Sequence, residues 1–463
     1  MTAQLVPRRI LAAAAAVLAA AAVWLVHHAL SLTELYHGNR DRLAIVYAGM
    51  YLLLVWQLCL AYLERPASPD PQAMRILDGL RVACLVPVFN EDPEALRACL
   101  RSVFEQQRLP QVVYVVDDGS TQGDYPEVVD WARAAAAKAG VTLEWHRKPN
   151  AGKRHAQAVA VAGTPDADVY WTVDSDTISD PQALSELLKP FADSRVMSVA
   201  GVVLAANVRR SFLCRFTDLW FVTAQLVDRS ALSVLGSVWV NSGPIAAYRA
   251  DVIRGNLEGY VSETFMGRHV HFSDDSMLTL YAMLRGRTVQ QPTAYSFSLM
   301  PETVRHHARQ FVRWMRGSFI RSLWRMRYLP ATSLAFWIHA LRWTQTVVSA
   351  AVFVCFAVWL PIVGAGWSMA PWLVAVPLVV GYAQTLRYLV VRRSDQSTGY
   401  HWRTWLLTPV AVVWSMVVLR ALRWYGVATC WATSWGTRTR VEVTLSGADS
   451  AMSAVPRNAD HPA

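Results

Sequence analysis

Long stretches without charged residues constrain this chain more than any other feature. Ile10 to Leu30 carries no formal charge, and at about 1.5 Å per helical residue it spans roughly the 30 Å of a hydrocarbon core. Leu43 to Leu63 is a second such stretch, stopped by Glu64-Arg65-Pro66. We expect a transmembrane hairpin over residues 1–66 with both ends on the cytoplasmic side. A cleaved signal peptide is the alternative for the first stretch, but the apolar run is too long for one.

The composition adds a large water-exposed domain to these spans. Hydrophobic residues make up 54% of the 463 residues, yet the 17% that are charged crowd into the middle of the chain. The formal net charge of +10 does not require nucleic acid, because membrane proteins collect Lys and Arg on their cytoplasmic side. The six cysteines are scattered without a CxxC pair, which predicts reduced thiols rather than disulfides or a zinc site.

Residues 67–300 have the texture of an α/β domain. Short β-branched runs alternate with helical segments that begin after Pro93, Asp124, Ala151 and Pro181. The predicted strands are Val82–Val88, Val112–Val116, Val141–Trp145 and Val169–Val173. Strand and helix in alternation predict a mostly parallel sheet, whose ligands bind beyond the carboxyl ends of the strands.

The segment over residues 301–332 is basic and aromatic. Thr303 to Tyr328 contains seven arginines and no acid, a pattern typical of a helix lying on an anionic membrane surface. Two further spans are predicted within residues 333–392, at Phe336–Ile362 and Trp372–Val391. We expect Arg342 to face the bundle interior and Arg387 to reach the interface.

The last apolar segment, Trp405 to Leu419, has arginines on both sides and contains Pro409. The charges favour one and the same side for its two ends, so we expect an interfacial or re-entrant segment within residues 393–445 and four spans in total. A fifth span, which would place the C-terminus outside, is the alternative. Residues 446–463 are expected to be disordered.

Acidic pairs follow two of the predicted strands. Asp117 and Asp118 end one strand, where carboxylates can hold the ribose and base of a nucleotide; a plain Asp-Gly turn is the alternative. Asp174 and Asp176 follow another strand, and two such carboxylates can share a divalent cation, Mg²⁺ or Mn²⁺, with a diphosphate.

Two further clusters lie on predicted helices. Asp274 and Asp275 open a helical stretch, either as capping residues or with one of them as a general base. Gln310, Arg313 and Trp314 share one face of the basic helix. There an arginine can neutralise a diphosphate and an indole can stack on a sugar, although lipid contact is the simpler use of each alone.

Taken in order, these motifs resemble those of membrane-embedded processive glycosyltransferases of family 2, most closely the hyaluronan synthases, with chitin-oligosaccharide synthases nearby. The series is Val86-Pro-Val-Phe-Asn-Glu91, Val116-Asp-Asp-Gly-Ser120, Asn150-Ala-Gly-Lys-Arg154, Asp174-Ser-Asp176, Ser242-Gly-Pro244, Ser273-Asp-Asp275, Gln310-x-x-Arg-Trp314 and Trp435-Gly-Thr-Arg438. The resemblance implies a cytoplasmic GT-A-type domain inserted between transmembrane helices.

The resemblance also implies roles for individual residues. Asp275 would be the catalytic base beside Asp274, and Asp174 and Asp176 would frame the metal. The donor would be held by Asp117, Asp118, Lys153, Asp174, Arg313, Trp435 and Arg438, and the acceptor by Gln310, Trp314, Ser242, Gly243 and Pro244. Two departures from the family pattern are Ser273, where glycine is usual, and Asn241, where cysteine is frequent; the second puts the identity of the polymer in doubt.

The function implied is inverting transfer from UDP-sugars, UDP-GlcNAc and UDP-GlcA, to a growing β-linked polysaccharide at the cell membrane, with the polymer secreted. The partners would then be donors, polymer and membrane lipid, and no nucleic acid. A synthase that uses a single donor, a transferase to a lipid acceptor, and a catalytically silent membrane scaffold are the alternatives.

Overall fold

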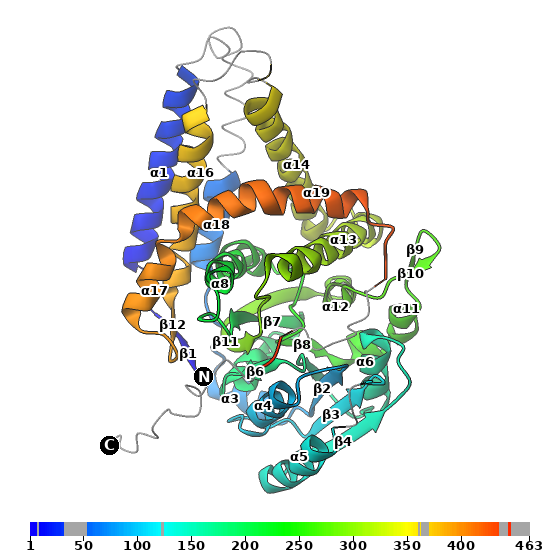
Figure 1. Cartoon of the computed structure of the whole chain (residues 1–463). Coiled ribbons are helices and arrows are strands. Elements are labelled where there is room, and N and C mark those ends of the chain that lie inside the picture. Colours follow the sequence, from blue (N-terminus) through cyan, green and yellow to red (C-terminus); the bar gives the residue numbers. More distant parts are fainter. Residues whose placement is uncertain are drawn as a thin grey trace, which may run out of the picture.

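An eight-stranded mixed sheet forms the centre of the molecule (Figure 1). The computed structural model describes residues 1–6, 9–31, 53–121, 125–359, 362, 370–434 and 443–445. In the order of the sheet, the strands are β4 (Thr142–Arg147), β3 (Val112–Asp117), β2 (Val82–Val88), β5 (Val169–Thr172), β8 (Ala246–Arg249), β7 (Val196–Ala205), β11 (Arg287–Ser298) and β6 (Thr177–Ser179).

The sheet is parallel in one half and mixed in the other. β4, β3, β2 and β5 are mutually parallel, as predicted. β7 and β11 are parallel to each other and run in the same direction as these four strands, whereas β8 runs antiparallel to both β5 and β7, and β6 runs antiparallel to β11. Six of the eight strands thus share one direction, as the expectation of a mostly parallel sheet requires. β6 is reversed because the Asp174–Asp176 turn closes directly after β5, with Thr177 N donating to the Asp174 carbonyl at 3.0 Å.

The direction of β8 matters for the site. Because β8 opposes β5, with Thr172 paired to Ala246, the residues just before β8 lie at the same edge as the residues just after β5. Ser242-Gly243-Pro244 and the Asp174–Asp176 turn therefore meet at one edge of the sheet.

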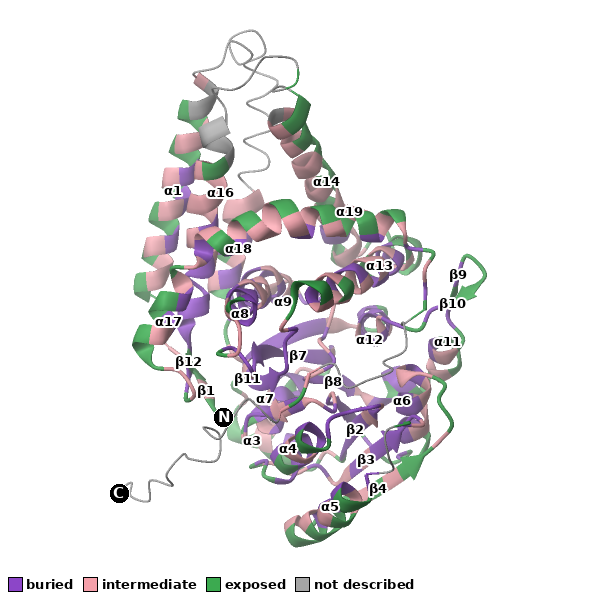
Figure 2. Ribbon diagram, viewed as in Figure 1, coloured by how far each residue is buried: buried purple, intermediate pink, exposed green. Residues whose placement is uncertain are grey.

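Helices cover both faces of this sheet. α4 (Pro93–Phe104), α5 (Pro126–Ala139) and α7 (Ala183–Leu188) pack on one face, and α6 (Lys153–Ala162), α10 (Ala250–Arg254), α11 (Leu257–Val261) and α12 (Asp274–Met283) on the other. In β2, Val82, Cys84 and Val86 join the first core and Ala83 and Leu85 the second, the alternation expected of a strand buried on both faces. Figure 2 shows the central strands buried, and the outer helix faces and the edge strand β4 largely exposed.

Further elements complete the domain. They are α3 (Pro71–Asp78), η1 (Lys189–Ala192), α8 (Phe212–Ala224), the π-helical turn η2 (Gln225–Arg229), α9 (Ser230–Val234), the hairpin β9 (Thr264–Phe265) and β10 (Arg268–His269), and α13 (Val304–Tyr328). α13 is the predicted basic helix, and it lies between the sheet and α19 (Arg420–Ala428) in Figure 1.

Apolar helices extend from one side of this domain. They include α1 (Arg9–Ser31), the helix over Leu53–Leu63, α14 (Leu334–Val354) with the π-helical η3 (Cys355–Trp359), and α16 (Ala370–Thr385), which lies beside α1 (Figure 1). Among the described residues, three helical segments are long and apolar enough to cross a membrane: Arg9–His28, Leu334–Trp359 and Thr408–Ala428. The number and direction of the spans remain predictions.

One sequence expectation about the C-terminal part is confirmed and one is wrong. The apolar segment Trp405–Leu419 is interrupted at Pro409, which occupies the first turn of α18 (Thr408–Trp414) after the preceding helix has ended at Trp405; that position tolerates proline since its N–H has no helical partner. α18 continues through η6 (Ser415–Leu419) into α19. Arg387 does not reach an interface. It is fully buried, donates to the Leu226 carbonyl and lies 3.6 Å from Glu64.

The start of the chain and the segment after α16 form a small second sheet. β1 (Ala3–Leu5) pairs antiparallel with β12 (Val391–Arg393), between η5 (Tyr388–Val390) and α17 (Thr398–Trp405). The amide of Ala3 donates to the Asp180 carboxylate at 3.0 Å. The strand pair thus ties α1 and α16 to the end of β6 in the α/β domain.

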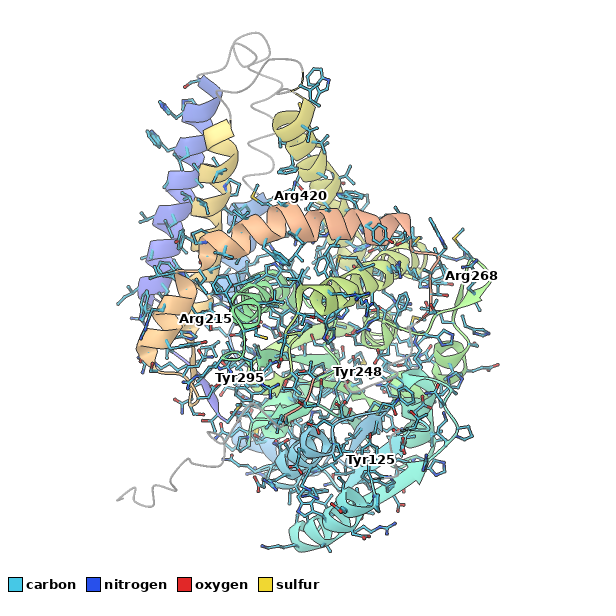
Figure 3. The ribbon with its side chains drawn as sticks, in the orientation of Figure 1. Tyr125, Arg215, Tyr248, Arg268, Tyr295 and Arg420 are labelled. Atoms are coloured by element: carbon cyan, nitrogen blue, oxygen red, sulfur yellow. The ribbon has the colours of Figure 1, made fainter. Side chains whose placement is uncertain are left out.

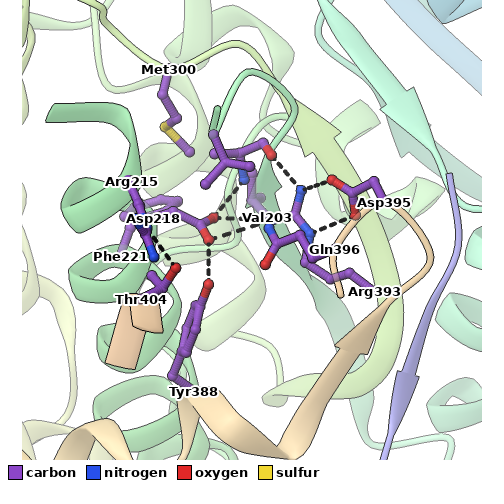
Figure 4. A network of polar contacts seen from close by, with 12 residues as sticks. Val203, Arg215, Asp218, Phe221, Met300, Tyr388, Arg393, Asp395, Gln396 and Thr404 are labelled. Atoms are coloured by element: carbon purple, nitrogen blue, oxygen red, sulfur yellow. Dashed lines mark hydrogen bonds and ion pairs between the residues drawn. The ribbon is translucent and has the colours of Figure 1, made fainter. Parts of the chain in front are cut away.

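A buried polar network holds the same segment against α8 and β7 (Figure 4). Asp218 accepts hydrogen bonds from the Tyr388 hydroxyl at 3.1 Å and from the Ala205 amide at 2.8 Å. Arg393 lies 3.4 Å from Asp218, donates to the Ala205 carbonyl at 2.6 Å and pairs with Asp395 at 2.7 Å. Because each buried charge has a charged partner and further hydrogen bonds, the network satisfies the condition for burying ions.

Candidate active site

Four residues from distant motifs meet at the edge of the sheet. The ammonium of Lys153, at the start of α6, lies 2.7 Å from Asp174 Oδ1 and 3.0 Å from Asp274 Oδ2. Gly243 closes the group: a Cβ placed on it would lie 3.1 Å from the Asp174 carboxylate and 3.2 Å from Lys153 Nζ. The Asn150–Arg154 loop, the Asp174–Asp176 turn, the Ser242–Pro244 loop and the Asp274-Asp275 motif therefore form one site.

The first acidic pair positions this group from one side. Asp118 accepts hydrogen bonds from the amides of Ala151 and Gly152 at 3.0 and 2.7 Å and pairs with Lys148. Both of its oxygens are thus used to fix the turn that leads into Lys153. In the structure Asp118 therefore holds the loop that carries Lys153, and its predicted contact with the donor stays a prediction.

Asp117 is differently placed. It is fully buried, and its Oδ1 accepts the Ser120 amide at 2.9 Å. Its Oδ2 has no hydrogen-bond partner among the described residues and lies 3.6 Å from Arg147 Nε. A buried acceptor oxygen without a donor is costly, so this atom is suited to an N–H or O–H group of a ligand.

Asp275 has the electrostatics of a general base. Burial and the neighbouring Asp274 carboxylate raise its pKa from 3.8 to about 7, the range in which a carboxylate is an efficient base at neutral pH. Asp274 responds the opposite way: burial opposes its ionisation, but the attraction of Lys153 outweighs burial and lowers its pKa. One carboxylate is thus kept ionised while its neighbour becomes basic.

Ser273 provides the backbone geometry of this motif. It occupies the N-cap position of α12 with φ +62°, and its side chain makes no capping bond. Asp275 accepts the amide of Ser276 at 2.7 Å. Tyr248, labelled in Figure 3, lies beneath the motif with its hydroxyl 3.4 Å from the Asp275 carbonyl.

The acidic turn after β5 fits a divalent cation in part. Asp174 and Asp176 are hard oxygen donors on one turn, and such sites are completed by substrate phosphates and water. Ser175, between them, donates to Glu91 at 2.8 Å and fixes the turn. No cluster of three or more His, Cys, Asp or Glu side chains that could hold a metal occurs in the described parts of the chain.

The predicted face of α13 approaches the motif through a glycine. Gly317 lies one turn beyond Arg313 and Trp314, and a Cβ on it would lie 2.5 Å from Ser273 Oγ. Gln310, Arg313 and Trp314 are half-buried, and the Trp314 ring stacks on Phe221 at 5.8 Å. The helix that carries these residues is therefore packed directly against the Asp-Asp motif.

Sequence reasoning missed a buried ion-pair network behind the site. Glu263 pairs with Arg154 at 2.6 Å and with Arg321 at 2.7 Å, and it accepts the Trp324 indole N–H at 2.7 Å. Arg154 also donates to the Phe272 carbonyl at 2.7 Å. Glu263 thus joins α6, the Asp-Asp loop and α13. Arg321 lies two turns beyond Trp314 on the same face of α13, so helical spacing could have identified it. Nothing in the sequence around Glu263 indicates its role.

Two of the predicted residues cannot be placed relative to this site. Trp435 and Arg438 lie outside the described residues. The described chain nearest to them reaches the site, because the Thr433 carbonyl accepts the amide of His271 at 3.2 Å.

Comparison with known proteins agrees with this geometry. The profile described as glycosyltransferase like family 2 matches residues 80–317. A hyaluronan synthase of Streptococcus pyogenes serotype M3 is 32% identical over 418 residues, which cover 86% of this chain and 95% of that protein. An N-acetylglucosaminyltransferase of Azorhizobium caulinodans is 36% identical over 52% of this chain and 60% of its own length.

The fold has a counterpart among solved structures. A mannosyltransferase from Pyrobaculum calidifontis, solved in complex with GDP-Man and Mn²⁺, matches 86% of this chain and 98% of its own with a TM-score of 0.52 at 18% identity. The curled mixed sheet is that of a GT-A-type glycosyltransferase.

The chain belongs to glycosyltransferase family 2 and is an enzyme of that class. Within the family it is related to the hyaluronan synthases, over most of its length.

Proposed function

We propose that this protein is a membrane-bound, inverting and processive β-glycosyltransferase that polymerises UDP-GlcNAc and UDP-GlcA and secretes the product. The observation that carries the proposal is the junction of Lys153, Asp174, Asp274 and Gly243, which joins the donor loop to the Asp-Asp motif. The relationship to hyaluronan synthases over most of the chain supports the choice of donors.

The donor lies across the carboxyl edge of the parallel half of the sheet. Asp117 Oδ2 accepts a hydrogen bond from the uridine, and Lys153 faces the diphosphate. Arg313, on the α13 face that packs on Ser273, supplies a second cation for the leaving UDP, since a guanidinium matches phosphate oxygens in a planar fork. Trp435 and Arg438 cover the bound donor.

Asp174 and Asp176 would hold Mg²⁺ or Mn²⁺ together with the diphosphate, and the cation would supply positive charge to the departing UDP. The fold counterpart from Pyrobaculum calidifontis was solved with Mn²⁺, which supports a divalent cation in this class. Because Asp174 also contacts Lys153 at 2.7 Å, cation binding and the position of Lys153 are linked.

The acceptor sugar lies between Asp275 and the face of α13. Asp275 removes the proton of the attacking hydroxyl while its oxygen bonds to the anomeric carbon and the bond to UDP breaks. Direct displacement inverts the anomeric centre and needs no covalent intermediate. Gln310 and Trp314, with the Ser242–Pro244 loop, hold the acceptor end, and Trp314 offers an aromatic face to the sugar.

The apolar helices suggest the route of the product. We propose four spans, with α13 and the segment from α18 to α19 lying on the cytoplasmic membrane surface. In Figure 1, α18 and α19 run across the direction of α1 and α16, and Gly426 of α19 packs on Val312 and Met315 of α13. A reporter fused after Ala463 should stay inside; an external reporter would reject this topology.

A donor-omission assay tests the proposal. Purified full-length protein receives radiolabelled UDP-GlcNAc with or without UDP-GlcA, and polymer is measured by size. We expect long polymer only with both donors. Polymer from UDP-GlcNAc alone would identify a single-donor synthase, in keeping with the N-acetylglucosaminyltransferase relative. A short chloroform-soluble product would indicate a lipid acceptor, and absence of UDP release would indicate a silent scaffold.

A further inference from the structure

Arg229, at the end of the π-helical turn η2, is a buried cation directly behind the Ser-Gly-Pro loop. Its Nη1 donates to Ser242 Oγ at 2.9 Å and its Nη2 donates to the Gly201 carbonyl at 2.7 Å. It also donates to the side-chain oxygens of Gln225 and Gln290. One guanidinium thus ties the loop to β7, to β11 and to its own helix.

The partners of Arg229 are unusual for a buried charge. Within the described residues, no carboxylate lies at ion-pair distance from its guanidinium, and every acceptor is neutral. Burial lowers its pKa to about 10, so it stays charged at neutral pH. Burying a cation without a contacting anion is unfavourable, which makes a purely structural role a poor explanation for it.

The network continues from Arg229 to the apolar helices. Gln290 donates to Glu64 at 3.3 Å and to Ser230 Oγ at 3.1 Å, and Ser230 in turn donates to Glu64. Glu64 ends the second apolar helix, and Arg387 follows α16 at 3.6 Å from it. A continuous polar chain therefore runs from the ends of two apolar helices to Ser242.

The residue before Arg229 faces the apolar helices themselves. Asp228 pairs with Arg342 of α14 at 3.0 Å and accepts a hydrogen bond from Gln57. Neighbouring residues of one π-helical turn thus contact the apolar helices and the Ser-Gly-Pro loop. Single π-helical turns are frequent at functional sites, where they redirect side chains.

At the other end of the chain of contacts, Ser242 is next to Gly243, the glycine that fits against Asp174 and Lys153. A small shift of the loop would change the space at this junction, because a Cβ there already meets both groups at 3.1 to 3.2 Å. The rate of a reaction falls steeply when the reacting groups are displaced from their productive positions.

We propose that Arg229 is a positioning residue, which holds the Ser242-Gly243-Pro244 loop in the transfer-competent place and links it to the helices that surround the product. This inference rests on the proposed function, since it concerns the acceptor side of that site. In this proposal Arg229 acts through Ser242, to which it donates a hydrogen bond, and not by contact with donor or acceptor.

The test is a double-mutant cycle with R229Q, S242A and the double variant in purified full-length protein. R229Q should lower kcat by about 10- to 100-fold with donor affinity, measured by calorimetry, within about threefold of wild type. If Arg229 acts through Ser242, the double variant should be no slower than R229Q, because coupled residues are not additive. Multiplicative losses, or a rate for R229Q within twofold of wild type, would overturn the proposal.

R249Q is the matched control. Arg249 is a half-buried arginine of β8 in the same sheet, and it too donates to neutral acceptors, the backbone carbonyls of Val196 and Phe191. Its loss should lower Tm comparably to R229Q and leave kcat near wild type. Equal losses of kcat in both variants at equal Tm would show a structural role and overturn the proposal.

R229K keeps the buried charge, and it replaces R229Q in this test if R229Q does not accumulate as folded protein. Lysine cannot reach all of the acceptors at once, so a loss of at least about threefold in kcat is expected, and a wild-type rate would count against the proposal. Wild-type protein that releases no UDP would reject the proposed function itself. An active wild type whose Arg229 variants match R249Q would reject the positioning role alone.

Discussion

The two halves of the sheet differ in how their functional residues are brought together. In the parallel half, from β4 to β5, each motif follows directly from a strand, so Asp117 and Asp174 arrive at one edge through local chain direction. In the mixed half, the Ser242–Pro244 loop, the Asp-Asp motif and α13 are placed by contacts between residues far apart in the sequence, such as Glu263 with Arg154 and Arg321.

This difference separates two tasks. The parallel half holds a nucleotide at the place where open α/β sheets bind ligands, and it depends little on the apolar helices. The mixed half presents the base and the acceptor side, and its polar contacts extend to Glu64 and Arg387 beside those helices. A substitution in the mixed half should therefore change the rate of transfer without an equal change in the affinity for the donor.

The largest separation is expected for D275N. Loss of the base should lower transfer by about 10²- to 10⁴-fold, while the donor dissociation constant changes little because the parallel half is untouched. UDP release and calorimetric donor binding measure the two effects. D251N, which removes an exposed acid of α10, is the matched control and should behave as wild type. Normal turnover in D275N would rule out this residue as the base.

A second prediction concerns the ion pairs that join the halves. In E263Q, two buried arginines lose their carboxylate, and breaking such a pair typically costs about 3–5 kcal/mol. Thermal unfolding of the purified protein should show a clearly lower Tm. E186Q, which removes a half-buried acid paired with Lys189, should cost less. Equal Tm values for the two variants would show that Glu263 does not hold the halves together.

The parallel half was largely predictable from the sequence, and the mixed half was not. β2 begins and ends at the predicted residues, and α4 begins at Pro93, because buried strands and proline-started helices have local signals. β8 and β11 were not foreseen, since their place depends on long-range pairing. For the same reason Arg387 was expected at an interface, although its partner Glu64 lies more than 300 residues away in the sequence.

The candidate site divides in the same way. Asp174, Lys153, Asp274 and Gly243 were singled out by their motifs, and the structure brings them together. Arg229 and Glu263 were missed because nothing near them in the sequence marks a buried charge. Gly317 repeats the helix face of Gln310 and Trp314 at the next turn, so it could have been found from that spacing.

The pH dependence should reflect the mixed half alone. Asp275 acts as a base only when ionised, and burial with the Asp274 charge raises its pKa to about 7. Below pH 7, kcat/KM should therefore fall about tenfold per pH unit, with a plateau above it. The dissociation constant of the donor should not show this change below pH 7. The range from roughly pH 5.5 to 8 brackets this pKa. A kcat/KM that does not change over this range would contradict the assignment of Asp275 as the base.

The smallest expected effect concerns the contact between α13 and α19. In G426A the new Cβ would lie 2.8 Å from Met315 Cβ and 3.2 Å from the Val312 carbonyl, and such overpacking costs about 1–3 kcal/mol. Tm should fall slightly, with transfer reduced more than donor affinity. G399A, with no neighbour closer than 3.9 Å, is the control. A G426A protein as stable as G399A would mean that the two helices are not held in this contact.

Gly243 offers the most direct measurement, because it belongs to the mixed half and touches the donor residues of the parallel half. In G243A the added methyl would press on Asp174 and Lys153 at 3.1 to 3.2 Å. We predict that donor affinity and transfer both fall, each by at least about fivefold, or about 1 kcal/mol. Unchanged donor affinity with unchanged transfer would contradict the central claim that the two halves meet in one active site.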